Sequence, residues 1–372
     1  MQIETDEYWM RRAIAVARKG WGGTHPNPSV GAVIVDGAEL LAEGYHAVAG
    51  GPHAEVEAIR NLTGPVPESA TMYVTLEPCS TQGRTPACTD AIIRAGIKRV
   101  VVGALDDDAR HRGQGLEILR NAGVQATAGV LADECYDLNL IFHFYHSTGR
   151  PLIAAKVATT IDGRTAVESG ASKWITGEKS RQNVHEWRRY FPAIAVGART
   201  VLADDPALTA RIGSRTFCPA RLIFDRSGRL ANVPDRRVLT DEFRDRTTIF
   251  VSESALPKVK SALPSEVDIV AFPHEPLFRD FLLEWLLERG LHGLYVEGGA
   301  RLHSLLFAQR AVDYLFAYRA PKLFLDQNAR PVGEGMRLKD PTEAITVDQC
   351  RHEVFGADQL LRGKVCYPKE VE

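Results

Sequence analysis

The sequence has 372 residues, enough for two domains of moderate size. Its 45% hydrophobic and 25% charged residues are typical of a globular protein, and its net charge of −2 argues against a general nucleic-acid or membrane-binding surface. No apolar run approaches the roughly 18–20 residues that cross a bilayer, and the acidic N-terminus does not resemble a signal peptide. We therefore expect a cytoplasmic protein whose cysteines are thiols, ligands or nucleophiles rather than disulfides.

Helix and strand patterns alternate along the first part of the chain. Apolar residues at helical spacing predict a first helix around Met10–Ala17 that ends at Gly20, and Asp36-Gly37 predicts a hairpin turn between two strands. The elements expected after the hairpin are a helix from His53, a strand over 71–76, a helix from Cys88, a strand over 99–105, a helix around 115–123, a strand over 124–130 and a helix near 132–146. The polar segment Ser147–Pro151 is typical of a linker.

A second alternating pattern begins after this segment. Its expected strands are 192–197, 221–225, 247–252, 268–272, 293–299 and 314–323, and its expected helices are 179–190, 277–289 and 300–310. Such alternation favours a largely parallel sheet with helices on its faces. We therefore expect two α/β domains, residues 1–147 and 148–372.

The stretch YVTLEPCSTQGRTPACTD, residues 73–90, contains two cysteines at an unusual spacing. Cys79 follows a proline at a strand end, and Cys88 begins a helix, where the helix dipole favours a thiolate. His53 and Glu55 lie at the start of another helix, where residues two apart point in different directions. One histidine and two thiolates provide three zinc ligands and leave the fourth tetrahedral position to water.

In this interpretation Glu55 is not a ligand but the catalytic residue that moves protons from water to a ring nitrogen and to departing ammonia. His-x-Glu followed by Pro-Cys is typical of zinc-dependent nucleobase deaminases, although eight residues instead of two separate these cysteines. The alternatives are a surface or capping histidine and cysteines that only fill the core. The combination of these residues, in this order, favours the zinc site, provided that the intervening loop returns Cys88 to Cys79.

The segments HPNPSVGAVIV, EGYH, PHAE and YVTLEPCSTQGRTPAC together resemble the bifunctional riboflavin-biosynthesis deaminase/reductase family, and the resemblance extends over nearly the whole chain. It implies a cytidine-deaminase-like α/β/α domain in the N-terminal half. The implied roles are zinc ligation by His53, Cys79 and Cys88, proton transfer by Glu55, and substrate binding by Asn27 and His46.

With this resemblance, the segment between the cysteines becomes a candidate phosphate-binding loop. Ser80, Arg84 and backbone N–H groups could hold the 5′-phosphate of a ribosylated pyrimidine, although Arg84 could also be a solvated surface residue. Family members commonly have histidine where this chain has Thr81, and the loop that begins at Asp106 also differs from the family pattern.

In the second half, Glu297-Gly298-Gly299 lies between a predicted strand and a predicted helix. This turn would expose backbone N–H groups to a phosphate, although a Gly-Gly turn is often only a turn. No Gly-x-Gly-x-x-Gly follows a predicted strand and no P-loop motif occurs, so neither common nucleotide fingerprint is present.

The same family resemblance implies a dihydrofolate-reductase-like C-terminal domain that uses NADPH. The residues that match cofactor positions are Ala158, Trp174, Thr200, Asp204, Gly299, Ala300, Arg301, Leu302, His303, Ser304 and Leu305. Those that match substrate positions are Ser172, Arg188, Leu208, Arg211 and Glu297, and Lys156 lies in a matching segment. Arg188 and Arg211 suit phosphate because guanidinium groups match its oxygens. Arg226 replaces a serine usual in the family and could meet the cofactor's 2′-phosphate or face solvent.

The predicted function is therefore two consecutive reactions: deamination of 2,5-diamino-6-ribosylamino-4(3H)-pyrimidinone 5′-phosphate, then NADPH-dependent reduction of its ribosyl group to ribityl. One alternative is a zinc deaminase whose reductase-like domain only binds a ligand. Another is a non-catalytic RNA-binding or regulatory protein, against which the intact zinc motif and near-neutral charge argue. The resemblance also implies a dimer or larger homo-oligomer, which binds small pyrimidine substrates and not nucleic acid or membrane.

Overall fold

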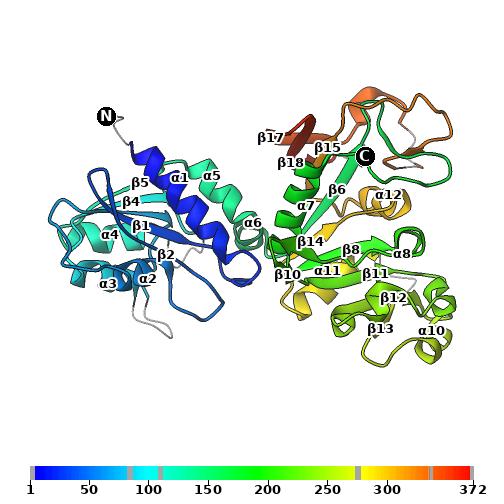
Figure 1. Ribbon diagram of the computed structural model, residues 1–372, viewed down its shortest axis with the longest axis horizontal. Coiled ribbons are helices and arrows are strands. Elements are labelled where there is room, and N and C mark those ends of the chain that lie inside the picture. The colour runs from blue at the N-terminus through cyan, green and yellow to red at the C-terminus, as the bar shows by residue number, and fades with distance from the viewer. Residues whose placement is uncertain are drawn as a thin grey trace. The chain divides into compact units, whose positions relative to one another are not determined.

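A computed structural model describes residues 5–81, 87–107, 112–272, 278–333, 335 and 338–368. The chain divides into two compact units, Met1–Gly149 and Arg150–Glu372 (Figure 1), and the division falls inside the polar segment Ser147–Pro151. In the described part of the chain, the helices are all too short or too polar to span a bilayer.

The first unit is built on a five-stranded sheet with the order β2-β1-β3-β4-β5. Its strands are β1 (Gly31–Asp36), β2 (Glu39–Tyr45), β3 (Thr71–Leu76), β4 (Arg99–Ala104) and β5 (Gln125–Ala128). Strand β1 is antiparallel to β2 and β3, while β3, β4 and β5 run parallel. The hairpin loop is one residue later than predicted, because Asp36 still pairs with Glu39 and the chain turns at Gly37-Ala38.

Helices cover both faces of this sheet (Figure 1). They are α1 (Asp6–Ala17), followed by the short η1 (Arg18–Gly20), α2 (Ala54–Arg60), α3 (Cys88–Arg94), α4 (Gln114–Asn121), α5 (Ala132–Leu138) and α6 (Leu140–Thr148). Alternate residues of the central strands face opposite layers, as the two-residue period of a strand requires. Met72 and Val74 pack towards α2, α3 and α4, whereas Tyr73 packs towards α1 and α5. The single helix predicted near 132–146 is interrupted at Asn139.

The second unit contains a nine-stranded sheet with the order β13-β12-β11-β8-β14-β6-β15-β18-β17. These strands are β6 (Leu152–Thr159), β8 (Ala193–Gly197), β11 (Ala220–Phe224), β12 (Thr247–Ser252), β13 (Asp268–Phe272), β14 (Gly293–Val296), β15 (Tyr314–Arg319), β17 (Thr346–Phe355) and β18 (Asp358–Cys366). Every neighbouring pair from β13 to β15 is parallel, as predicted. The two small sheets pair β9 (Ala210–Ile212) with β10 (Arg215–Phe217), and β7 (Arg164–Ala166) with β16 (Arg330–Pro331).

Two separate apolar clusters fill the two faces of the large sheet. The helices are α7 (Glu178–Tyr190), α8 (Ala198–Asp204), α9 (Arg237–Thr240), α10 (Leu256–Ala262), α11 (Phe278–Glu288) and α12 (Ala300–Ala308), with η2 (Arg229–Asn232), η3 (Arg244–Arg246) and η4 (Pro341–Glu343). Helices α11 and α12 cover one face through Trp285 and Leu306, and α8, α9 and α10 cover the other through Val201 and Val259. Helix α7 packs Trp187 against Phe316 of β15.

The C-terminal hairpin β17–β18 was not predicted, and its antiparallel pairing makes the large sheet mixed. Strand β17, TVDQCRHEVF, has mostly polar residues and lacks the continuous apolar run that marks the central strands. It is the outermost strand of the sheet, and its residues are exposed or only partly buried. Such a strand does not need apolar residues at regular positions, so the sequence contains no pattern that predicts it.

Candidate active sites

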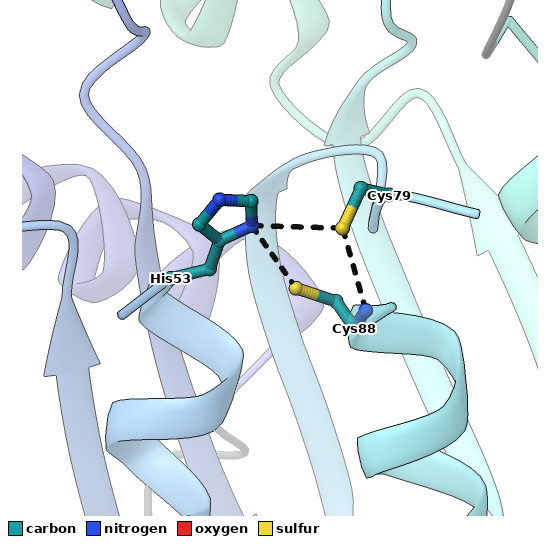
Figure 2. Close-up of side chains that lie close together, drawn as sticks. All are labelled: His53, Cys79 and Cys88. Carbon is teal, nitrogen blue, oxygen red and sulfur yellow. Dashed lines mark hydrogen bonds between the residues drawn. The ribbon is translucent and has the colours of Figure 1, made fainter. Parts of the chain in front are cut away.

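Three element ends of the first unit bring His53, Cys79 and Cys88 together (Figure 2). His53 is the N-cap residue of α2, Cys79 follows β3 and a proline, and Cys88 is the first residue of α3. The Nδ1 atom of His53 lies 3.2 Å from the Sγ atom of Cys88 and 3.6 Å from that of Cys79. The predicted return of Cys88 to Cys79 therefore occurs, although most of the loop between them lies outside the described residues.

The donor set fits a zinc ion. One imidazole nitrogen and two sulfurs lie within 4.8 Å of one another, and three such ligands form an open tetrahedral site. The backbone N–H of Cys88 donates a hydrogen bond to the Cys79 sulfur at 3.3 Å. Hydrogen bonds from Cys88 and from His53 lower the pKa of the Cys79 thiol, whereas the hydrogen bond with Cys79 and burial raise the pKa of Cys88, so the structure favours the thiolate at Cys79 and not, as predicted, at Cys88. A thiolate is the form that binds zinc.

Glu55 lies in the first turn of α2 and is only 3% exposed. Burial raises the pKa of its carboxyl group to about 7. A general acid–base group works best when its pKa is close to the working pH. Glu55 is therefore buried two residues from the ligand His53 and has a pKa that suits the predicted transfer of protons.

Asn27 and His46 lie beside this cluster. The His46 ring packs edge-on against the His53 ring, with 5.5 Å between their centroids. Its Nδ1 atom is 2.9 Å from the carbonyl oxygen of Pro52, which can only accept, so Nδ1 carries the proton. Its Nε2 atom then accepts from the side-chain amide of Asn27 at 3.3 Å. No described residue donates to the amide oxygen of Asn27, which can therefore accept a hydrogen bond from a ligand.

The segment that follows Cys79 is described only in part. The hydroxyl oxygen of Ser80 is buried and has no hydrogen-bond partner within the described residues. Thr81 is exposed. Arg84 lies outside the described residues, so its predicted role in phosphate binding stays a prediction.

Sequence reasoning missed Asn139, the residue between α5 and α6. Its side-chain oxygen accepts from the backbone N–H of Ser29 at 2.7 Å, and its side-chain nitrogen donates to the carbonyl of Ser29 at 3.0 Å. Both residues are buried. Asn139 thereby anchors the loop that carries Asn27, and a contact across 110 residues leaves no local signal in the sequence.

The second unit contains a cavity of about 1360 Å³. Sixteen residues with predicted reductase roles line it, which are Lys156, Ala158, Ser172, Trp174, Arg188, Thr200, Asp204, Leu208, Arg211, Glu297, Gly299, Ala300, Arg301, Leu302, His303 and Leu305. Arg226 also lines it. Ser304 is not among the lining residues, and its hydroxyl donates to the carbonyl of Ala300 within α12.

The turn between β14 and α12 contributes part of the cavity wall. Gly298 has a φ of +105°, a conformation that residues with a side chain rarely adopt, and Gly299 is the N-cap residue of α12. A β-carbon on Gly298 would also lie 3.0 Å from the His303 ring. The two glycines thus allow a tight turn whose backbone faces the cavity, as expected of a phosphate-binding turn.

Arg188 and Glu297 form a buried ion pair in this cavity. The Nε and Nη2 atoms of Arg188 donate to the two carboxylate oxygens at 2.5 and 2.7 Å, and Nη1 donates to the carbonyl of Thr209 at 3.0 Å. Arg188 and Lys156 hold the pKa of Glu297 at about 2 despite its burial. The positive charge of Arg188 is therefore largely neutralised by Glu297, an interaction that the sequence analysis did not anticipate.

Other charged and aromatic groups surround this ion pair. The Lys156 ammonium lies 5.9 Å from the centre of the Tyr318 ring, and burial lowers its pKa. Burial lowers the pKa of both His185 and His303 to about 4, so both rings are neutral near pH 7. Trp174, in the wall of the same cavity, is 63% exposed and stacks under the Arg181 guanidinium, so it is not a core residue.

Family models match both units of the chain. The model of the cytidine and deoxycytidylate deaminase zinc-binding region matches residues 3–104, and that of the RibD C-terminal domain matches residues 151–361. The riboflavin biosynthesis protein RibD of Actinobacillus pleuropneumoniae is 40% identical over 98% of this chain and 96% of its own length. The chain belongs to the RibD family. RibD of Aquifex aeolicus is also 40% identical, over 96% of this chain and 98% of its own length.

Solved RibD structures share the fold of the whole chain. The deaminase/reductase from Thermotoga maritima is 36% identical, has a TM-score of 0.79 and covers 97% of this chain and 99% of its own. RibD from Acinetobacter baumannii is 35% identical, with a TM-score of 0.78, and covers 98% of this chain and 100% of its own. The predicted fold class is confirmed: a cytidine-deaminase-like unit precedes a dihydrofolate-reductase-like unit. As a RibD protein, the chain contains a zinc-binding deaminase domain and a reductase domain.

Proposed function

We propose that this chain catalyses two consecutive reactions of riboflavin biosynthesis, the first in the unit Met1–Gly149 and the second in the unit Arg150–Glu372. The first is hydrolytic deamination of 2,5-diamino-6-ribosylamino-4(3H)-pyrimidinone 5′-phosphate to its uracil analogue. The second is reduction of the ribosyl group of that product to ribityl with NADPH. The name of the Thermotoga maritima relative, a diaminohydroxyphosphoribosylaminopyrimidine deaminase and 5-amino-6-(5-phosphoribosylamino)uracil reductase, supports this pair of substrates.

The first reaction needs a nucleophilic water, a proton carrier and a group that orients the ring. Zinc held by His53, Cys79 and Cys88 would supply the Lewis acidity that makes water nucleophilic near neutral pH. Glu55 takes one proton from the attacking water and passes it to the ring nitrogen, and then carries the second proton of that oxygen to the amino group, which leaves as ammonia. The amide oxygen of Asn27, fixed by the contact of Asn27 with His46, is placed to accept from an N–H of the pyrimidine.

The second reaction depends on holding two ligands in one cavity. NADPH supplies the hydride when it is bound, and the protein orients it against the open-chain sugar. The N–H groups at Gly299 and the start of α12 suit the phosphates of the cofactor, because a helix N-terminus favours anions. Lys156 and Arg211 provide positive charge for the substrate, while Arg188 is held by Glu297 and presents its remaining N–H groups in a fixed direction.

The observation that carries the proposal is the convergence of His53, Cys79 and Cys88 next to a buried Glu55. The second unit of the same chain contains the cavity lined by the predicted reductase residues. The test is to supply purified zinc-loaded protein with the diamino substrate and NADPH and to follow ammonia and NADPH separately. We expect ammonia release first and NADPH oxidation only after deaminated product has formed. Ammonia release without any NADPH oxidation would mean that the second unit only binds a ligand.

We further propose that the protein acts in the cytoplasm as a homodimer or larger assembly formed through the second unit. The absence of a membrane-spanning helix within the described residues is compatible with this location. Strand β17 is the outermost strand of the large sheet and offers an edge for association. Light scattering of the purified chain tests the assembly, and a monomer at micromolar concentration would contradict it.

A further inference from the structure

Glu77 is a buried carboxylate next to the metal site with no role in the proposed chemistry. It lies between the end of β3 and Pro78, two residues before the ligand Cys79, and is 4% exposed. Its backbone N–H donates to the carbonyl of Ala104 at the end of β4, at 2.9 Å. Its main chain is thus tied to the sheet, and its side chain points away from solvent.

The two carboxylate oxygens of Glu77 accept four backbone N–H groups. Oε2 accepts from Asp106 at 3.3 Å and Gly113 at 2.9 Å. Oε1 accepts from Gly115 at 3.0 Å and Leu116 at 3.4 Å. These donors belong to the segment after β4 and to the first residues of α4, where the helix dipole favours a negative charge. Backbone dipoles thereby compensate a charge whose burial would otherwise be costly.

Close packing reinforces the same connection. A β-carbon on Gly115 would lie 2.2 Å from the carbonyl oxygen of Pro78, so only glycine allows α4 to approach this closely. The first turn of α4 therefore touches the residue that immediately precedes Cys79, through the Glu77 carboxylate and through Pro78. In the sequence, the motif Glu-Pro-Cys marks this place, but Glu77 is 36 to 39 residues from Gly113, the N-cap residue of α4, and from Gly115 and Leu116 on α4.

We propose that Glu77 is a positioning residue for the metal site, which holds Pro78 and Cys79 against α4 so that the Cys79 thiolate faces His53 and Cys88. The inference rests on the proposed zinc site and extends it to a group that touches neither metal nor substrate. Groups that orient a metal ligand typically change metal affinity about 10- to 100-fold when they are replaced. The Glu77 carboxylate orients its ligand through the main chain.

The decisive variant is Glu77→Gln. It keeps the size of the side chain but places an amide NH₂ against two backbone N–H donors, so one pair of hydrogen bonds must break. We expect about 10- to 100-fold weaker zinc binding in competition with a chromophoric chelator. We also expect a shifted thiolate absorption band of the Co²⁺-loaded protein, because the geometry of Cys79 around the metal changes. NADPH oxidation with the deaminated substrate should stay at the wild-type rate.

Glu117→Gln is the matched control, since it makes the same chemical change on an exposed side chain of the same helix. Gly115→Ala is a second route to the same effect, because it pushes α4 away from Pro78 without changing any charge. Wild-type zinc affinity and an unchanged Co²⁺ spectrum in both Glu77→Gln and Gly115→Ala would overturn the inference. Loss of the helical circular dichroism of the first unit in metal-free Glu77→Gln would also overturn it, by making Glu77 a general determinant of folding. A wild-type chain that binds no zinc would instead refute the proposed function.

Discussion

The metal site of the first unit takes its ligands from the ends of three elements, and the ligand atoms lie within 4.8 Å of one another. The cavity of the second unit is far larger, and its lining residues range along the chain from Lys156 to Val332. The first site is compact and contains a carboxyl group whose pKa is about 7, which suits proton transfer. In the second, Glu297 and His303 keep one charge state near neutral pH, since the pKa of Glu297 is about 2 and that of His303 is about 4.

This difference matches the chemistry proposed for each unit. Deamination moves protons, so its site needs a group that can gain and lose one at the working pH. Hydride transfer takes its electrons from the cofactor, so its site mainly needs shape and fixed charge. The two sites should therefore respond differently to substitution and to pH, and the predictions below separate them.

The largest effect is expected from removal of a metal ligand. Cys79→Ser replaces a thiolate with a hydroxyl group that stays protonated and does not bind zinc well. We expect the zinc content to fall from about one ion per chain to near zero and ammonia release to be lost. NADPH oxidation should be unchanged. Cys350→Ser, at an exposed cysteine on β17, should retain zinc and both activities; zinc loss there would point to a different site.

A smaller but still large effect is expected from the buried ion pair. Glu297→Gln leaves the Arg188 charge uncompensated in the cavity and should destabilise the protein by about 3–5 kcal/mol. Reductase activity should fall while zinc binding persists. The control is Glu266→Gln, which breaks the exposed ion pair of Glu266 with Arg244. It should change neither the stability nor the reductase activity. Equal unfolding midpoints in urea for the two variants would contradict the account of this pair.

The pH dependence of stability offers a third comparison. Since burial lowers the pKa of His303 from an ordinary 6.5 to about 4, the unfolded chain binds its proton first as the pH falls. Stability should therefore decrease between pH 6.5 and pH 4, by about 3 kcal/mol from this group at pH 4. When the free energy of unfolding in urea is measured at pH 7 and pH 4, His303→Gln should lose about 3 kcal/mol less than the wild type between the two pH values. The exposed His352→Gln should behave like the wild type, and the same behaviour in His303→Gln would contradict this assignment.

The smallest effect is expected at Asn139. Asn139→Ala leaves the N–H and the carbonyl of Ser29 unpaired, which loosens the loop that carries Asn27. We expect the KM of the deaminase to rise about 10-fold, equivalent to about 1.4 kcal/mol, with unchanged zinc content and reductase activity. Asn121→Ala, at an exposed residue of α4, is the control. A decrease in kcat with an unchanged KM would show that Asn139 does not act through the substrate loop.

The two sites differ in how well the sequence alone predicts them. His53, Glu55, Cys79 and Cys88 lie at the starts and ends of strongly patterned elements, so their convergence could be inferred from the sequence. The cavity residues were identified from family resemblance, because their positions around one cavity depend on the order of strands in the sheet.

Contacts between distant residues could not be predicted. Arg188 meets Glu297 across 109 residues, and Asn139 meets Ser29 across 110, so no pattern within a window of the sequence indicates either pair. The hairpin β17–β18 was missed for a different reason, since its outer strand is mostly polar. The alternation of apolar strand patterns with helix patterns predicts the central sheets, whereas the hydrogen bonds and ion pairs between distant residues are seen only in the structure.

The central claim is that two independent sites act in succession on one chain, and Glu55→Gln tests it most directly. The variant keeps the zinc ligands but cannot carry the proton, so ammonia release from the diamino substrate should fall by about 10²- to 10⁴-fold. NADPH oxidation with supplied deaminated substrate should proceed at the wild-type rate. Ammonia release at the wild-type rate would contradict the role of Glu55, and a parallel loss of NADPH oxidation would contradict the independence of the two sites.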